Sequence, residues 1–190
     1  MWALVIAKFL SDAAWYFYLF WLPKYLYDVR GFDTKQVGYY AWIPFAAAGF
    51  GSLTGGWFSS YLLRRGWPLA QARKVALGAS AALMPWAFFI TQSPVEMALV
   101  LFSLAFFGQQ SWSTLVMTLP ADLFPRGAVG AVAGLVGFGG AMGGVVFGLV
   151  VGRMLDAGAG YGPVFALVSS MHLLAFAWLL GMRALRPAGT

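Results

Sequence analysis

The sequence contains no cysteine, a single histidine and few charges of either sign. Without cysteine, the chain can form neither a disulfide nor a thiolate nucleophile or thiolate metal site. His172 has no acidic residue one helical turn away, and the six acidic residues of the whole chain offer few ligands to a metal. No phosphate-binding loop is present. We therefore expect no enzyme activity, no metal and no cofactor, and we expect His172 to be a packed, neutral side chain.

Charged residues make up 9% of the chain, against about 25% in a typical soluble domain. Hydrophobic residues make up 61%, which is more apolar surface than one globular core of this size can hide. The composition therefore predicts a protein that crosses the lipid bilayer several times. The net charge of +6 does not indicate nucleic acid, because the basic residues lie in loops between apolar segments.

Runs of about 20 apolar residues are long enough to cross a bilayer as helices. Six such runs fill the chain and leave no room for a soluble domain. The expected fold class is an all-α membrane protein, with a single six-helix bundle over residues 1–190. The expected spans are residues 3–27, 36–63, 74–91, 94–119, 128–152 and 163–185.

Two connections carry helix-capping signals. Asp33 is followed three residues later by Gln36, which predicts a capping box at the start of the second span. Ser93, Pro94 and Glu96 predict a similar box before the fourth span. We expect that span to end at Pro120.

The lysine and arginine residues predict the orientation in the membrane, because cytoplasmic loops carry an excess of them. With an even number of spans, both termini lie on the more basic side, which we expect to be the cytoplasmic side of the inner membrane. That side holds Lys8 just inside the membrane, together with Arg64, Arg65, Arg73, Lys74, Arg126, Arg183 and Arg186. The other side holds Lys24, Arg30, Lys35 and Arg153, balanced by Asp28, Asp33, Glu96 and Asp156.

The first span carries polar residues at helical spacing. Lys8, Ser11, Asp12 and Trp15 share one face of a helix, and ionisable residues inside a membrane usually face a protein interior or a watery cavity. This favours a pathway for a solute. The alternative is that Lys8 extends to the headgroups and Asp12 only pairs with it one turn away. The stretch by itself does not decide between the two.

The fourth span contains a second polar patch, Gln109 to Thr114, in an otherwise apolar run. Amides and hydroxyls in a cavity can bind the hydroxyls of a polyol, and Trp112 can lie against the C–H face of a sugar ring. Because Gln109 and Gln110 point to different sides of the helix, at most one is expected to face the cavity. The alternative is hydrogen bonding between helices, worth only about 0.6 kcal/mol per bond.

Two further sets of residues suggest helix packing and a gate. Gly140, Gly144, Gly148 and Gly152 recur every fourth residue, so we expect them to form a stripe on which a neighbouring helix packs closely, either statically or with sliding. Asp122 and Arg126 lie at helical spacing in a cytoplasmic loop. They form either a gate, with Arg64 and Arg65, or a solvated local pair.

Three stretches of the sequence resemble the major facilitator superfamily: WYFYLFWLPKYL, GGWFSSYLLRRGW and LPADLFPRGAVGAVAGLVGFGGAMGG. The chain is most similar to the anion:cation symporters, in particular the bacterial hexuronate transporters, and the resemblance covers only their carboxyl-terminal half, helices seven to twelve. Many members carry an acidic and then a basic residue in the loop after helix eight. This chain departs from that charge latch, with Ser60-Tyr61 before Arg64-Arg65.

The resemblance implies an inner-membrane carrier in which two six-helix halves rock about a central anion site and protons drive uptake of a sugar acid. It places substrate contacts on helices seven and ten. Those helices carry Lys8, Ser11, Asp12 and Trp15, and Gln109, Gln110 and Trp112.

Two functional hypotheses follow. In the first, the chain is half of a proton-coupled organic-anion carrier: Lys8 attracts a carboxylate, Gln109 or Gln110 binds hydroxyls, and Trp112 stacks on the substrate. Its partners are then a small organic anion, protons and the missing amino-terminal half, and the chain is expected to be a fragment because Met1 leads directly into the first span. In the second, the chain is a six-span membrane scaffold or assembly subunit without transport activity.

Overall fold

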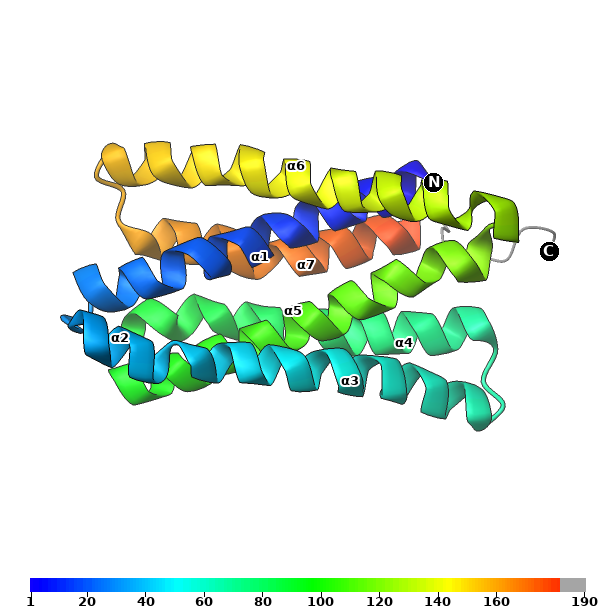
Figure 1. Ribbon diagram of the computed structural model, residues 1–190, viewed down its shortest axis with the longest axis horizontal. Helices are drawn as coiled ribbons and strands as arrows, with labels where there is room; N and C mark the ends of the chain where they lie inside the picture. Colours follow the sequence, from blue (N-terminus) through cyan, green and yellow to red (C-terminus); the bar gives the residue numbers. More distant parts are fainter. Residues whose placement is uncertain (182–190) are drawn as a thin grey trace.

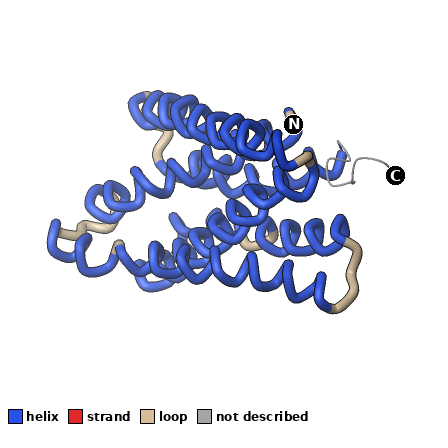
Figure 2. Tube along the Cα trace, turned by 45° about the vertical axis from the view of Figure 1, so that its right-hand side comes forward, coloured by secondary structure: helices blue, strands red, loops and turns tan. Residues whose placement is uncertain are grey.

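The computed structural model describes residues 1–181, and the regular structure in that range is entirely helical. The helices form rods that lie side by side and alternate in direction, with the connecting loops gathered at the two ends of the bundle (Figures 1 and 2). This confirms the all-α prediction. In chain order the elements are α1 (Trp2–Asp28), α2 (Thr34–Tyr40), α3 (Trp42–Arg64), α4 (Leu69–Ala81), the 3₁₀ helix η1 (Met84–Gln92), α5 (Val95–Leu123), the 3₁₀ turn η2 (Arg126–Ala128), α6 (Val129–Asp156) and α7 (Tyr161–Gly181).

Most of the rods have the length and composition of membrane-spanning helices. Within the described residues, five helical stretches are long and apolar enough to cross a membrane: Trp2–Asp28, Leu69–Gln92, Val95–Leu123, Arg126–Asp156 and Tyr161–Gly181. The rod formed by α2 and α3 is long enough, but glycine, serine and threonine interrupt its apolar residues. It is not one of the five, so the second crossing remains a prediction. Residues 182–185 of the sixth expected span lie outside the described residues.

The ends of the helices differ from the expected spans in several places. The second span is divided at Ala41, and the third begins earlier, at Leu69, and changes to 3₁₀ geometry at Met84. Helix α5 continues past Pro120 to Leu123, with the Phe124 amide donating to the Pro120 carbonyl at 3.1 Å. Membrane helices tolerate an internal proline because neighbouring groups satisfy the freed carbonyl.

One of the two capping predictions is confirmed. The Asp33 carboxylate accepts from the Gln36 amide at 2.7 Å, and the Gln36 side chain accepts from the Asp33 amide at 2.9 Å, which completes the predicted capping box. The prediction for Ser93 is wrong, because its hydroxyl donates back to the Phe89 carbonyl at 2.8 Å. Pro94, and not Ser93, is the N-cap residue of α5, and it makes no side-chain cap.

The N-terminus, the α3–α4 loop and the α5–α6 turn lie at one end of the bundle, and the α1–α2 and α6–α7 connections lie at the other (Figure 1). The α3–α4 loop and the α5–α6 turn thus share one end, and Arg64, Arg65, Arg73, Lys74 and Arg126 lie in or near them. That this end is cytoplasmic stays a prediction. Arg183 and Arg186, which were counted on that side, lie outside the described residues.

The bundle has two apolar cores. One surrounds Phe17, Tyr18, Phe102 and Phe165 near the α1–α2 end, where the rings of Phe17 and Phe165 meet edge to face with centroids 5.2 Å apart. The other lies toward the N-terminal end of α1 and contains Leu4, Leu77, Trp112, Leu115, Val136 and Leu179. Many large apolar side chains point outward instead, as expected of a surface that faces lipid.

Arg30 ties the α1–α2 loop to the end of η1. Its guanidinium donates to the carbonyls of Ile90 and Ser93, at 2.7 and 2.8 Å, and to the Tyr25 hydroxyl at 3.0 Å. These carbonyls lie at and just beyond the end of η1, where no helical amide follows to pair with them. Arg30 therefore stabilises the break between η1 and α5.

We expect Arg30→Ala to lower the stability of the purified protein by about 1.5–3 kcal/mol, because hydrogen bonds from a charged donor to partly buried carbonyls are lost. The measurement is thermal unfolding in detergent. Arg153→Ala is the control, since Arg153 is exposed at the same end of the bundle. Equal unfolding midpoints for the two variants would contradict the role given to Arg30.

Candidate functional site

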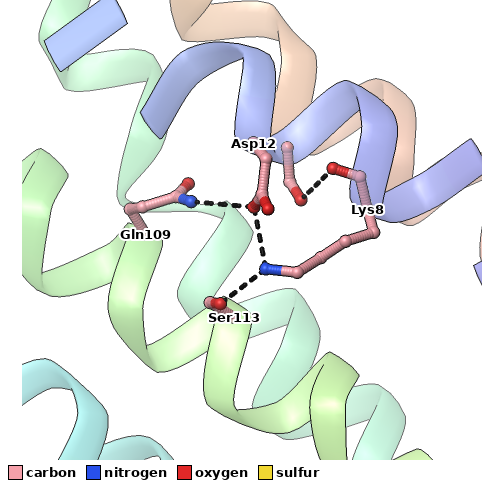
Figure 3. Close-up of polar contacts among 5 residues, drawn as sticks. Lys8, Asp12, Gln109 and Ser113 are labelled. Carbon is pink, nitrogen blue, oxygen red and sulfur yellow. Dashed lines mark hydrogen bonds and ion pairs between the residues drawn. The ribbon is translucent and has the colours of Figure 1, made fainter. Parts of the chain in front are cut away.

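A buried ion pair on α1 lies between the two apolar cores. Lys8 and Asp12 are one turn apart, and the Lys8 Nζ lies 2.8 Å from the Asp12 Oδ1 (Figure 3). Only 6% of Lys8 and 8% of Asp12 is exposed. The expectation that Lys8 extends to the headgroups is therefore not met, while the expected pairing with Asp12 is present.

Helix α5 supplies the remaining partners of this pair. The Lys8 ammonium donates to the Ser113 hydroxyl at 2.7 Å, and the Gln109 amide nitrogen lies 3.5 Å from the Asp12 Oδ1 (Figure 3). The Ser11 hydroxyl turns back to the Lys8 carbonyl at 3.2 Å. We call Lys8, Asp12, Gln109 and Ser113 the polar layer. It joins the first and fourth expected spans, the two that carry the predicted site residues.

A second lysine–aspartate pair on α1 shows what is particular about the first. Lys24 and Asp28 are also one turn apart, with 2.6 Å between the charged atoms, but their side chains are 55% and 39% exposed. Exposed pairs of this kind contribute little to stability. A buried pair is different, because removing one partner leaves an uncompensated charge and costs about 3–5 kcal/mol.

Next to the polar layer is an open cavity of about 390 Å³ between α1, α3 and α5. Trp15 forms one wall, with its ring edge to face on Phe106 at 5.4 Å. Gln110 and Ser52 supply polar groups, and the Ser52 hydroxyl also lies 2.7 Å from that of Thr114. The cavity is lined by Trp15, Phe45, Ala48, Gly49, Ser52 and Gln110.

The two adjacent glutamines separate as their spacing predicts. Gln109 is buried in the polar layer, whereas Gln110 is partly exposed and lines the cavity. Successive residues of a helix are about 100° apart, so α5 presents one amide to the ion pair and the next to the open space. Two consecutive residues of α5 therefore face different places: Gln109 contacts the ion pair and Gln110 lines the cavity.

Trp112 does not lie on this cavity. It is 0% exposed, and its ring contacts His172 and Phe176 of α7, with centroid distances of 5.6 and 6.3 Å. Its position two residues beyond Gln110 turns it toward the opposite side of α5. Trp15 is the tryptophan that borders the cavity.

The close approach of helices at α6 involves a different set of glycines from the expected stripe. Gly140 and Gly144 face α1, and so do Gly139 and Gly143, where a Cβ would collide with the backbone or side chains of that helix. Gly148 and Gly152 have no neighbouring atom within 4 Å of a Cβ position among the described residues. The α1–α6 contact uses two pairs of adjacent glycines, Gly139 with Gly140 and Gly143 with Gly144, because α1 crosses α6 at an angle to the stripe of every fourth residue.

At Gly140 this contact reaches the ion pair. A Cβ there would meet the Asp12 carboxylate, with the Asp12 Cγ at 3.0 Å and the Lys8 Cγ at 3.1 Å. The absence of a side chain on α6 therefore allows Asp12 to lie beside Lys8 while the helices remain in contact.

A second charged cluster lies near the end that carries the basic loops. Asp122 pairs with Arg73 of α4, with Nε–Oδ2 and Nη2–Oδ1 distances of 2.7 and 3.3 Å, and Arg73 also donates to the Ser59 hydroxyl of α3 at 2.7 Å. The expected pair of Asp122 with Arg126 does not form, and Arg126 is exposed. Arg64 and Arg65 are exposed too, with the Arg65 guanidinium over the Tyr61 ring at 5.1 Å.

The site residues that the sequence did not single out are Ser52, Ser59, Arg73 and Ser113. Ser113 lay within the polar patch of the fourth span, and its spacing of four residues from Gln109 was the available signal. The partner of Asp122 had no local signal, because Arg73 is 49 positions away in the chain.

Long apolar helices with a buried charge pair and a cavity among them define a multi-pass membrane protein with a polar interior. The sequence profile of the Major Facilitator Superfamily matches residues 1–148, and the chain belongs to that superfamily. This is a family of membrane transporters and not of enzymes. It confirms the resemblance at the level of the superfamily.

Several curated transporters are similar to the chain. The hexuronate transporter of Escherichia coli K12 is 31% identical over 176 residues, which cover 91% of this chain and 40% of the transporter. The D-galactonate transporter of E. coli O6:H1 is 31% identical, with 89% and 39% covered. The probable galactarate/D-glucarate transporter of Bacillus subtilis is 28% identical, with 90% and 37% covered. The chain thus spans about two fifths of the length of these relatives.

We expect Gly140→Ala to displace Asp12 from Lys8 and to destabilise the protein by about 1–3 kcal/mol, the usual cost of overpacking a tight contact. Gly148→Ala is the matched control, because its Cβ would enter open space. Thermal unfolding of the two purified variants tests this. If Gly140→Ala and the wild type unfold at the same midpoint, α6 does not pack against the ion pair as closely as the structure indicates.

We expect Arg73→Ala to destabilise the protein by about 3 kcal/mol, because it leaves the largely buried Asp122 carboxylate without its partner. The exchange Arg73→Asp with Asp122→Arg should recover part of the loss, and Arg64→Ala should have little effect. Unfolding midpoints in detergent give the comparison. A double variant whose loss of stability equals or exceeds the sum of the losses in Arg73→Asp and Asp122→Arg would exclude a direct pair.

Proposed function

We propose that the chain is the carboxyl-terminal half of a secondary carrier that moves a sugar acid across the cytoplasmic membrane by alternating access, coupled to protons. The observation that carries the proposal is the polar layer beside an open cavity, in a member of a transporter superfamily. The relatives named above are transporters of hexuronate, D-galactonate and, probably, galactarate or D-glucarate. All of these are polyhydroxylated carboxylates.

The chemistry of the cavity suits such a solute. Gln110 and Ser52 line the cavity and can bind hydroxyl groups. Lys8 is not part of the lining, so its ammonium binds a carboxylate in the cavity only when it turns away from Asp12 and Ser113. Trp15 takes the stacking role first expected of Trp112, since its ring borders the cavity. Ser11 and Gln109 act indirectly, by holding Lys8 and Asp12 in place.

A full site requires a partner half. In carriers built from repeated halves, the substrate lies near the middle of the membrane at the interface between them. Here the cavity is open on one side, and polar groups facing hydrocarbon are costly. The missing half is therefore proposed to cover the face formed by α1, α3 and α5. The gathering of Arg64, Arg65, Arg73, Lys74 and Arg126 at one end supports a cytoplasmic location of that end and of both termini.

The scaffold alternative accounts for less of the structure. Close glycine packing between α1 and α6 suits either function. Burying an ion pair next to an open cavity carries a desolvation penalty, and a scaffold would not need such a pair. Family membership also favours the carrier.

The test compares Lys8→Gln with Lys24→Gln in the full-length carrier that contains this chain. Both changes remove a lysine paired with an aspartate on α1, but only Lys8 is buried. With labelled glucuronate or galacturonate, we expect Lys8→Gln to lower uptake by about 10- to 100-fold, the equivalent of one or two charge-assisted hydrogen bonds. Lys24→Gln should transport nearly as the wild type does.

Competition by unlabelled sugar acids and by simple carboxylates then ranks the substrates. Unchanged uptake in Lys8→Gln, with the protein present at normal levels in the membrane, would remove Lys8 from the site.

A further inference from the structure

A second open cavity, of about 310 Å³, lies between α3, α4 and α5. It is separate from the cavity that Trp15 borders, because the two use different sides of α3. Phe45 and Ser52 line the first cavity, whereas Thr54 and Trp57 line the second. With about 100° of rotation per residue, these two sets point in roughly opposite directions. We call the second cavity the α3–α4 groove, and it lies away from the face proposed for the partner half.

The polar atoms at the floor of the groove are already satisfied. The Ser111 hydroxyl lies 2.7 Å from that of Ser80, and the Ser80 hydroxyl donates to the Ala76 carbonyl at 2.9 Å. The Thr54 hydroxyl donates within its own helix. A Cβ on Gly55 would meet Ser111, so α3 and α5 close the floor by direct contact. A polar solute therefore finds few free partners here, and the rest of the lining suits hydrocarbon.

The groove opens toward the outside of the bundle. Trp57 and Phe58 of α3 face the small side chains of Ala76 and Ala79 on α4, which leaves space between the two helices. Trp57 is 59% exposed, and Ala79 is exposed as well. Helix α4 belongs to a stretch, Leu69–Gln92, that is long and apolar enough to cross a membrane. A groove along this helix therefore opens to the lipid.

Aromatic rings connect the groove to the basic end of the bundle. Trp57 stacks on Tyr61, with centroids 5.6 Å apart and 21° between the ring planes, and the Arg65 guanidinium lies over the Tyr61 ring at 5.1 Å. The spacing of four residues places all three on one face of α3. Eight residues of helix separate Trp57 from Arg65, a rise of about 12 Å. Half of the hydrocarbon core is about 15 Å thick, so a groove inside the hydrocarbon places Arg65 near the lipid headgroups.

The charge at this end is not balanced by the chain around it. Residues 34–95 contain no acidic side chain. Arg64 and Arg65 are exposed, and the ion pairs among the described residues do not include them. Arg73 differs, because it is bound to Asp122. Guanidinium groups bind phosphate with paired hydrogen bonds, so the two arginines suit a phosphate at the membrane surface.

We propose that the α3–α4 groove binds an acyl chain of an anionic phospholipid, whose phosphate pairs with Arg65 and Arg64. The apolar groove and the arginines are separated along α3 as the chain and the headgroup are separated in the lipid. Basic pockets between membrane helices are the places where anionic headgroups bind. The inference does not depend on which solute the protein carries.

The test of the charge uses the full-length protein that contains this chain, purified in dodecyl maltoside. Bound molecules are counted by native mass spectrometry during titration with phosphatidylglycerol, with phosphatidylcholine of the same chains, and with sn-glycerol 3-phosphate. We expect phosphatidylglycerol to bind more tightly than phosphatidylcholine, and glycerol phosphate not to bind. Arg65→Gln should weaken the binding of phosphatidylglycerol by about fivefold, the usual effect of one basic residue at a membrane surface. Arg126→Gln is the control, since Arg126 is exposed at the same end but lies on η2.

The test of the groove uses Ala79→Phe, which fills it. This change should weaken the binding of both lipids by about tenfold, roughly the effect of two buried CH₂ groups. Ala82→Phe is the matched control, because Ala82 is exposed at the end of the same helix and does not line the groove. Phosphatidylglycerol with brominated chains then locates the lipid, since bromine quenches the fluorescence of a tryptophan that it touches. Trp57→Phe should remove a saturable part of that quenching.

Four results would overturn the proposal. Phosphatidylcholine that binds as tightly as phosphatidylglycerol would exclude a role for the arginines. An equal loss in Arg65→Gln and Arg126→Gln would show general attraction to the basic end. Unchanged lipid binding in Ala79→Phe would place the chain elsewhere. Should that variant not fold, the quenching experiment decides, because quenching that is the same in Trp57→Phe and the wild type excludes the groove.

Discussion

The requirement on which this structure depends is that two opposite charges stay paired inside an apolar bundle. Lys8 and Asp12 lose most of their hydration, and only close pairing with additional hydrogen bonds offsets that cost. The helix supplies the pairing, since a spacing of four residues places both on one face of α1. Ser113 and Gln109 of α5 supply the additional bonds, and Gly140 of α6 leaves room for the carboxylate. The ion pair of α1 is thus in contact with both α5 and α6.

The polar layer also divides the interior. The aromatic core around Phe17 and Phe165 lies on one side of it, and the core that contains Leu4 and Leu115 lies on the other. Apolar contacts within each core need not break when contacts in the layer change. Within the layer, α1 and α5 are connected by two hydrogen bonds, from Lys8 to Ser113 and from Gln109 to Asp12.

Helical periodicity predicted much of this arrangement, and tertiary contacts account for what it missed. The face shared by Lys8 and Asp12 and the divergence of Gln109 and Gln110 both follow from about 100° of rotation per residue. The same rule could not tell which side of α5 would face the cavity, so Trp112 was assigned to the substrate although it packs on α7.

The spacing of Asp122 and Arg126 suggested a local pair, but Arg73, distant in the sequence, has the better geometry. The glycines at every fourth position marked the correct helix, whereas the crossing of α1 selected Gly139 and Gly143 in place of Gly148 and Gly152.

The 3₁₀ winding of η1 has a consequence for the thickness of the membrane that this bundle can span. Met84–Gln92 contains nine residues, and because a 3₁₀ helix rises about 2.0 Å per residue against 1.5 Å in an α-helix, rewinding the segment would shorten the rod by about 4–5 Å. Each residue of such a segment has poorer hydrogen-bond geometry than in an α-helix, so this rod is extended at some cost. A thinner bilayer would favour the shorter form, which makes the α4–η1 rod the element of the bundle whose length can follow its lipid surroundings.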